Sequence, residues 1–100
     1  MNAFQLTRAL IDIDSVTPNE EAVGVYLANY LGLLAKRTGG KVERIRVEPD
    51  VAPPRYNVLA TWDTPVVTLS THIDTVPPFF ASREDEEFIW GRGACDTWVV

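Results

Sequence analysis

Apolar side chains in the first 40 residues recur at intervals of three and four, which predicts two helices. The first apolar stripe runs over roughly residues 2–13 and consists of Ala3, Leu6, Leu10 and Ile13. The second stripe consists of Val23, Leu27, Tyr30, Leu31 and Leu34. Gly39-Gly40 then predicts the end of the second helix, because glycine readily adopts the left-handed conformation that commonly follows a helix.

The start of the second helix carries a capping pattern. In Thr17-Pro18-Asn19-Glu20, the Thr17 side chain can accept from the backbone N–H of Glu20, whose carboxylate can reach back. Pro18 suits the first helical position, where its missing N–H costs nothing. The pattern therefore predicts that the helix begins at Pro18.

After Gly40 the apolar period changes to two, which predicts strands. Ile45 and Val47 alternate with charged residues, and residues 56–62 and 66–71 are rich in β-branched and aromatic side chains. The run 66–71 has little polar alternation, which predicts a central strand buried on both faces. A further short strand is expected at residues 88–90. The order predicts an α/β fold, with two N-terminal helices followed by a mostly buried sheet in one domain.

Charge and composition narrow the possible partners. The net charge of −5 and the pI near 4.7 argue against nucleic-acid binding, which needs a surplus of Lys and Arg. No apolar run approaches the roughly 20 residues of a membrane span, so no membrane partner is expected. Cys95 is the single cysteine and cannot form an internal disulfide, which favours a reducing, cytoplasmic location.

The single histidine follows the apolar run 66–71. His72 and Asp74 are two residues apart, so in an extended chain both side chains project to one face. A metal-binding imidazole needs this arrangement, with one ring nitrogen on the metal and the other donating to a carboxylate. The alternative is a histidine hydrogen-bonded to a nearby acid without a metal, and this fragment alone favours it.

A second candidate is the stretch Gly91-Arg92-Gly93-Ala94-Cys95-Asp96. Its two glycines predict a turn whose backbone can pass close to another group, with Asp96 just beyond. A solvated aspartate is the alternative. The third glycine of a dinucleotide fingerprint is missing, which argues against a nucleotide-binding domain. Cys95 is expected to be a small buried side chain and not a ligand or nucleophile.

A third candidate is the run of four acids at residues 84–87. Four carboxylates could hold a hard cation loosely. A solvated hairpin turn between Phe79-Phe80 and Phe88-Ile89 is the stronger prediction.

The first two motifs together resemble the zinc amidohydrolase and peptidase family. This family includes acetylornithine deacetylase, succinyl-diaminopimelate desuccinylase, aminoacylase and glutamate carboxypeptidase, and its motifs are His-x-Asp after a strand and then Gly-Arg-Gly-x-x-Asp. The stretch from Ser15 to Glu21 and Asn57 also stand in family-like order. The resemblance therefore covers nearly the whole chain.

The resemblance implies two zinc ions in an intact site, with cobalt as a substitute. His72 would be a terminal ligand of one zinc, Asp96 the carboxylate that bridges both, and Asp74 the partner that orients His72. The peptide bond after Asp96 is usually cis in the family.

The chain also departs from the family pattern. Where the family continues with a Lys-like residue and Gly, this chain has Trp98-Val99-Val100. The family's paired glutamates, its remaining ligands and its lid or dimerisation domain would lie beyond. The sequence is therefore expected to be the N-terminal part, residues 1–100, of a truncated metallohydrolase catalytic domain.

The resemblance implies a metal-dependent hydrolase that cleaves an amide or peptide bond in an N-acyl amino acid or small peptide. This chain alone is expected to be inactive, because it offers two metal ligands and no general base. The alternative is a non-catalytic truncated product or interaction module that keeps only the start of the fold. The resemblance is also compatible with homodimers of the intact relatives.

Overall fold

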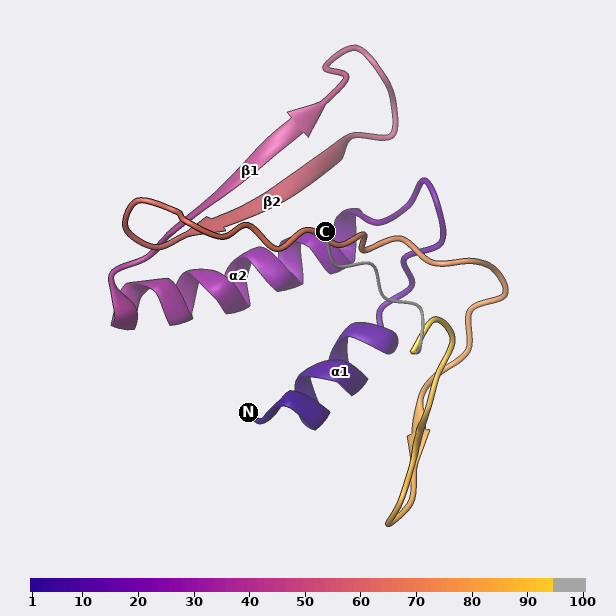
Figure 1. Cartoon of the computed structure of the whole chain (residues 1–100). Helices are drawn as coiled ribbons and strands as arrows, with labels where there is room; N and C mark the ends of the chain where they lie inside the picture. The colour runs from indigo at the N-terminus through magenta and orange to yellow at the C-terminus, as the bar shows by residue number, and fades with distance from the viewer. Residues whose placement is uncertain (95–100) are drawn as a thin grey trace.

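The computed structural model describes residues 1–94. It contains the helices α1 (Ala3–Ile11) and α2 (Glu21–Thr38), the hairpin of β1 (Lys41–Val47) and β2 (Arg55–Thr61), and the short hairpin of β3 (Arg83–Glu84) and β4 (Ile89–Trp90) (Figure 1). The prediction of an α/β chain that begins with two helices is confirmed. Cys95, Asp96 and the peptide bond after Asp96 lie outside the described residues.

Both helices form where the apolar periodicity predicts them. At the start of α1, the Asn2 side chain accepts from the Gln5 backbone N–H, and the Gln5 side chain accepts from the Asn2 N–H, both at 2.9 Å. This reciprocal capping satisfies two of the donors that a helix start leaves unpaired. At the end of α2, Gly39 adopts φ 78°, in the left-handed region that glycine enters without a steric penalty.

The capping box predicted at Thr17 is wrong, because long-range contacts occupy its members. Helix α2 begins at Glu21, and its N-cap residue Glu20 makes no side-chain capping hydrogen bond. The Thr17 hydroxyl instead donates to Asp74, and Glu20 pairs with Arg55 at the start of β2, with Nε and Oε1 2.5 Å apart. These two long-range contacts replace the capping hydrogen bonds between Thr17 and Glu20 that the sequence pattern predicts.

Strands β1 and β2 form an antiparallel pair in which Ile45 faces Asn57 and Lys41 faces Thr61. Helix α2 packs along this hairpin (Figure 1). Trp62 closes the junction, because its indole N–H donates to the Thr38 hydroxyl at 2.8 Å. The hairpin therefore lies over α2 as a two-stranded layer.

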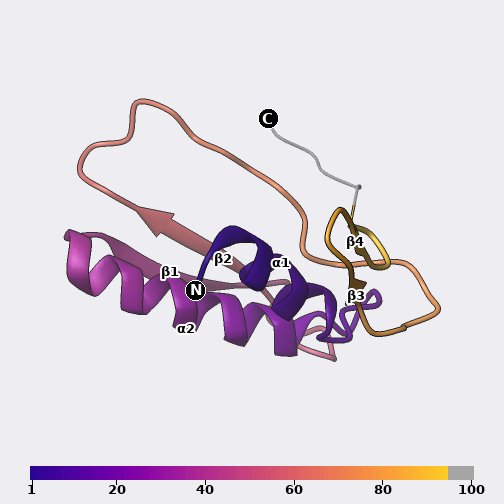
Figure 2. The ribbon, with the colours of Figure 1, turned by 90° about the horizontal axis from the view of Figure 1, so that it is seen from below.

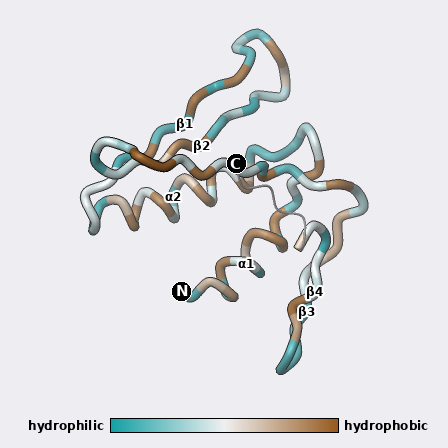
Figure 3. Tube along the Cα trace, viewed as in Figure 1, coloured by the Kyte–Doolittle hydropathy of each residue, from teal (hydrophilic) through white to brown (hydrophobic). Residues whose placement is uncertain are grey.

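The central strand predicted for residues 66–71 is wrong. Figure 2 shows the chain after β2 arcing away from α2 and the β1–β2 hairpin, and Figure 3 shows how apolar this stretch is. Val66 is 95% exposed and Leu69 is 77% exposed. No described strand pairs with residues 66–71, and apolar composition alone does not make a strand without a partner. The sheet is therefore not mostly buried in the described part of the chain.

The hairpin turn predicted at residues 84–87 is confirmed, although its first strand is β3 and not Phe79-Phe80. The Asp85 side chain accepts from the backbone N–H groups of Glu87 and Phe88, each at 2.8 Å. A short acceptor side chain of this kind stabilises a tight turn.

The buried apolar side chains of the described chain are few: Ile11, Val23 and Ala35. Ile11 ends α1, and the other two lie on α2. Within residues 1–94, neither helix is long and apolar enough to cross a lipid bilayer.

Candidate functional site

His72 and Asp74 contact each other directly. The His72 ring atom Nδ1 lies 2.9 Å from the Asp74 carbonyl oxygen and 3.2 Å from its carboxylate atom Oδ1. Each side chain is about one-third exposed. The two side chains therefore meet at the rim of the protein, where a ligand can reach them.

This contact determines which ring nitrogen of His72 carries the proton. A carbonyl oxygen and an ionised carboxylate can only accept, so Nδ1 must be the donor. In the neutral imidazole the lone pair is then on Nε2. This tautomer is the one that a metal ion requires when a histidine binds it through Nε2.

The second oxygen of the Asp74 carboxylate has its own partner. Thr17 donates its hydroxyl proton to Asp74 Oδ2. This hydrogen bond is the main cause that lowers the pKa of Asp74 below its usual value, and the backbone N–H of Asp74 and the contact with His72 act in the same direction. Asp74 is therefore held as a carboxylate, with one oxygen on Thr17 and the other on His72.

The segment that carries His72 and Asp74 is fastened to the loop before α2. Val16 and Thr75 form a parallel bridge, in which the Thr75 N–H donates to the Ser15 carbonyl at 2.9 Å and the Thr17 N–H to the Thr75 carbonyl at 3.3 Å. The Ser15 and Thr75 hydroxyls lie 3.0 Å apart, and Ser15 is 2% exposed. We call Ser15, Thr17, His72, Asp74 and Thr75 the His72 cluster.

Arg92 anchors the same loop from the other side. Its guanidinium is buried and donates to the carbonyls of Ile11 and Ile13, at 3.3 and 3.1 Å. A cation at the carboxyl end of a helix also interacts favourably with the helix dipole. Gly91 allows the close approach, because a Cβ at this position would lie 2.5 Å from the Ile11 side chain. The Gly-Arg-Gly turn is therefore packed against the end of α1.

A cavity of about 330 Å³ connects these parts. Its walls come from α1, α2, residues 71–76 and the Gly-Arg-Gly turn, so His72 and Arg92 line the same space. The two motifs of the sequence thus meet around one cavity.

The described residues fit one metal ligand and not a complete metal site. His72 has the required tautomer, and Asp74 is the carboxylate that orients it. No group of three His, Cys, Asp or Glu side chains able to hold a metal ion occurs within residues 1–94. The predicted bridging ligand Asp96 lies outside the described residues, so its role stays a prediction.

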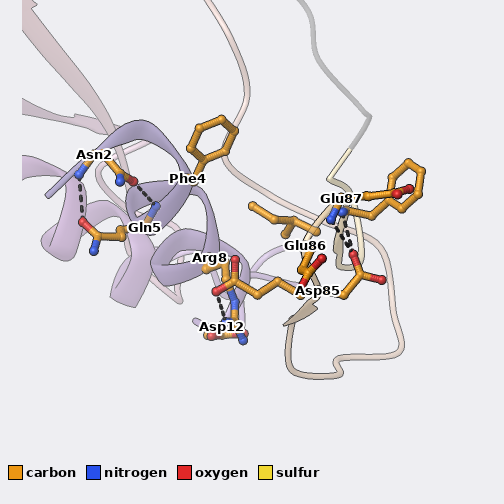
Figure 4. A pocket seen from close by; sticks show the side chains of 11 residues that line it. Asn2, Phe4, Gln5, Arg8, Asp12, Asp85, Glu86 and Glu87 are labelled. Atoms are coloured by element: carbon orange, nitrogen blue, oxygen red, sulfur yellow. Dashed lines mark hydrogen bonds and ion pairs between the residues drawn. The ribbon is translucent and has the colours of Figure 1, made fainter.

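The acidic run forms a separate surface, which we call the acidic hairpin (residues 83–90). A groove of about 780 Å³ lies between α1 and this hairpin (Figure 4). Arg8 spans the groove and pairs with Glu84, with Nη1 and Oε1 2.7 Å apart. The groove shares no lining residue with the cavity at His72. The acids of this run therefore line a different surface from His72.

Sequence reasoning missed three residues that build the His72 cluster or its surroundings. The sequence pattern predicts a helix cap at Thr17, and it indicates no partner for Arg55 or Arg92. Arg55 belongs here because Glu20, and to a smaller extent Asp74, raise its pKa above the usual value. The position of Arg92 between two glycines was the only signal available.

Comparison with known proteins points to one group of peptidases. The chain is 34% identical over 95 residues to a peptidase M20 domain-containing protein of Schizosaccharomyces pombe, which covers 95% of this chain and 23% of that protein. Probable carboxypeptidases of Arthroderma otae and Emericella nidulans are 32% and 36% identical, over 93% of this chain and 24% and 23% of their own lengths. No protein-family model and no solved structure matches the chain.

These similarities support a relationship to the M20 peptidases. The chain spans about a quarter of the length of these relatives. The resemblance found in the two motifs and the similarity over the whole chain thus lead to the same group.

Proposed function

We propose that this chain is the N-terminal part of a zinc-dependent hydrolase of the M20 peptidase type. Its substrate would be an N-acyl amino acid or a small peptide, and the bond cleaved an amide or peptide bond. The observation that supports this proposal most directly is the hydrogen bond between His72 Nδ1 and Asp74, in a chain similar to peptidases over 95% of its length.

In this proposal His72 would hold a zinc ion through Nε2, and Asp96 would supply the second, shared carboxylate ligand. When bound, zinc lowers the pKa of a coordinated water and polarises the scissile carbonyl. Asp74 keeps its carboxylate on Nδ1–H, which holds the ring in one tautomer and raises its basicity. Neither His72 nor Asp74 acts as the base that removes the proton of the water.

Metal binding by the 100-residue chain tests the proposal. We expect cobalt or zinc to bind the purified chain, and His72→Ala to weaken this binding by at least about tenfold, because His72 is the only histidine. Glu87→Ala in the acidic hairpin is the matched control and should leave the affinity unchanged. Equal metal affinities of the wild-type chain and His72→Ala would contradict the proposal.

The chain alone should not turn over N-acetyl amino acids in the presence of zinc. His72 and Asp96 give two donors, and loss of a general base by itself costs about 10²–10⁴-fold in rate. An assay of the wild-type chain beside His72→Ala measures this. Turnover clearly above the His72→Ala level would show that the site completes itself, for example between copies of the chain.

A further inference from the structure

Thr17 contacts the segment that carries His72 and Asp74 with both its backbone and its side chain. Its N–H donates to the Thr75 carbonyl at 3.3 Å, and its hydroxyl donates to Asp74 Oδ2. The Asp74 oxygen that Thr17 uses is the one that His72 does not use.

We propose that Thr17 is a positioning residue that sets the tautomer and orientation of His72 through the Asp74 carboxylate. This inference rests on the proposed function, in which His72 is a metal ligand. Thr17 would not touch the metal or the substrate itself.

The geometry gives the reason. A carboxylate that contacts only one partner can rotate about its Cβ–Cγ bond, and the 3.2 Å separation between His72 Nδ1 and Asp74 Oδ1 alone would hold it weakly. A hydroxyl on the other oxygen restricts this rotation and keeps Oδ1 directed at Nδ1–H. Because the backbone bridge between Val16 and Thr75 holds both segments in register, the Thr17 hydroxyl reaches Asp74 from a fixed position.

Ser15 offers a matched comparison within the same cluster. Its hydroxyl lies 3.0 Å from that of Thr75, so it joins the same two segments two residues earlier. No hydrogen bond connects the Ser15 side chain with Asp74 among the described residues. Loss of the Ser15 hydroxyl therefore weakens the attachment of the two segments without releasing the carboxylate that faces His72.

The single histidine makes the tautomer directly measurable. Long-range ¹H–¹⁵N spectra of the metal-free chain report the two ring nitrogens of His72 with no overlap from another histidine. Zinc affinity, measured by competition with a chromophoric chelator, is the second readout.

Thr17→Val removes the hydroxyl and keeps the shape of the side chain. The Asp74 carbonyl, 2.9 Å from His72 Nδ1, stays in place as an acceptor in this variant. We therefore expect the population of the Nδ1–H tautomer to fall without disappearing, and zinc affinity to fall about threefold to tenfold, less than the 10–100-fold typical when the orienting partner itself is lost. Thr17→Ser keeps the hydroxyl and should retain the wild-type tautomer and affinity. Ser15→Ala should lower the unfolding temperature and leave the tautomer unchanged.

The outcomes separate the two proposals. An unchanged tautomer and zinc affinity in a folded Thr17→Val would overturn the positioning role, and so would an equal loss in Ser15→Ala. If Thr17→Val loses the circular dichroism spectrum of the wild-type chain, Thr17→Ser becomes the test. Loss of the Nδ1–H tautomer or of the zinc affinity in Thr17→Ser also overturns the positioning role of Thr17. Zinc binding that does not depend on His72 would instead refute the proposed function.

Discussion

The His72 cluster and the acidic hairpin are both rich in polar groups, but they are built in opposite ways. In the His72 cluster hydrogen bonds join two distant segments of the chain, as from Thr17 to Asp74. His72 itself contacts Asp74, two residues further along its own segment. In the acidic hairpin Asp85 is used by its own turn, and Glu84 makes a half-exposed ion pair with Arg8. The number of carboxylates is larger in the hairpin, yet the cluster has the arrangement that suits a metal ligand.

This difference shows that the hydrogen bonds around a carboxylate, and not the density of charge, determine what it can do. Asp74 has one oxygen on a hydroxyl donor and the other on an imidazole, so its direction is set. In the acidic hairpin Glu86 and Glu87 are exposed, so solvent can satisfy their carboxylate oxygens. We expect the two regions to respond differently to substitution.

The largest difference should appear in zinc affinity. Asp74→Ala removes the acceptor that orients His72 and should lower the zinc affinity of the chain about 10–100-fold. Glu86→Ala in the acidic hairpin should change it by less than about twofold. Titration of both variants against a zinc-sensitive chelator measures this, and equal losses would show that the acids act only through overall charge.

The second largest difference should appear in how much a truncated apolar side chain in each region lowers the free energy of unfolding. Ile11 is 7% exposed and packs beside Gly91 at the cavity next to His72, whereas Phe88 in the hairpin is 59% exposed. Ile11→Ala should therefore lower the free energy of unfolding by about 3 kcal/mol, and Phe88→Ala by about 1 kcal/mol or less, although phenylalanine is the larger side chain. The shift of the urea unfolding midpoint measures the loss of stability in both variants. A larger loss in Phe88→Ala than in Ile11→Ala would show that the hairpin is the better packed region.

The elements that form from local interactions could be predicted from the sequence. The apolar stripes of α1 and α2 consist of residues three or four apart in the sequence. The turn at Asp85 is stabilised by backbone N–H groups two and three residues further along the chain. The contact between His72 and Asp74 also joins residues only two apart. These parts of the structure depend on neighbours that the sequence itself displays.

Features that depend on distant partners could not be predicted. The hydrogen bond from Thr17 to Asp74 spans 57 residues, and that from Arg92 to Ile11 spans 81. The run 66–71 has the composition of a strand, but it has no strand beside it among the described residues and stays exposed. A local pattern does not show which distant segment will compete for a side chain or fail to pair with it.

The smallest expected effect is the dependence of the acidic hairpin on pH through Asp12, which follows α1. The Asp12 carboxylate accepts from the Ser82 N–H at 2.6 Å, and this hydrogen bond is the main cause that lowers the pKa of Asp12 below its usual value of 3.8. Because the folded state favours the charged form, Asp12 stabilises the fold above about pH 4, and this contribution is lost as the pH falls through the lowered pKa.

Asp12→Asn removes this titration and keeps an oxygen that can accept from Ser82. We expect the variant to unfold at a slightly lower temperature than the wild-type chain at pH 7, and the difference to shrink towards pH 3, where the wild-type carboxyl is increasingly protonated. The Ser82 amide resonance should follow this titration in the wild-type chain and not in the variant. Asp50→Asn in the exposed β1–β2 loop controls for the loss of one negative charge. If the Ser82 amide moved equally in the wild-type chain and in Asp12→Asn, the hairpin would be held to α1 by Arg8 alone, and its attachment would not depend on pH in this range.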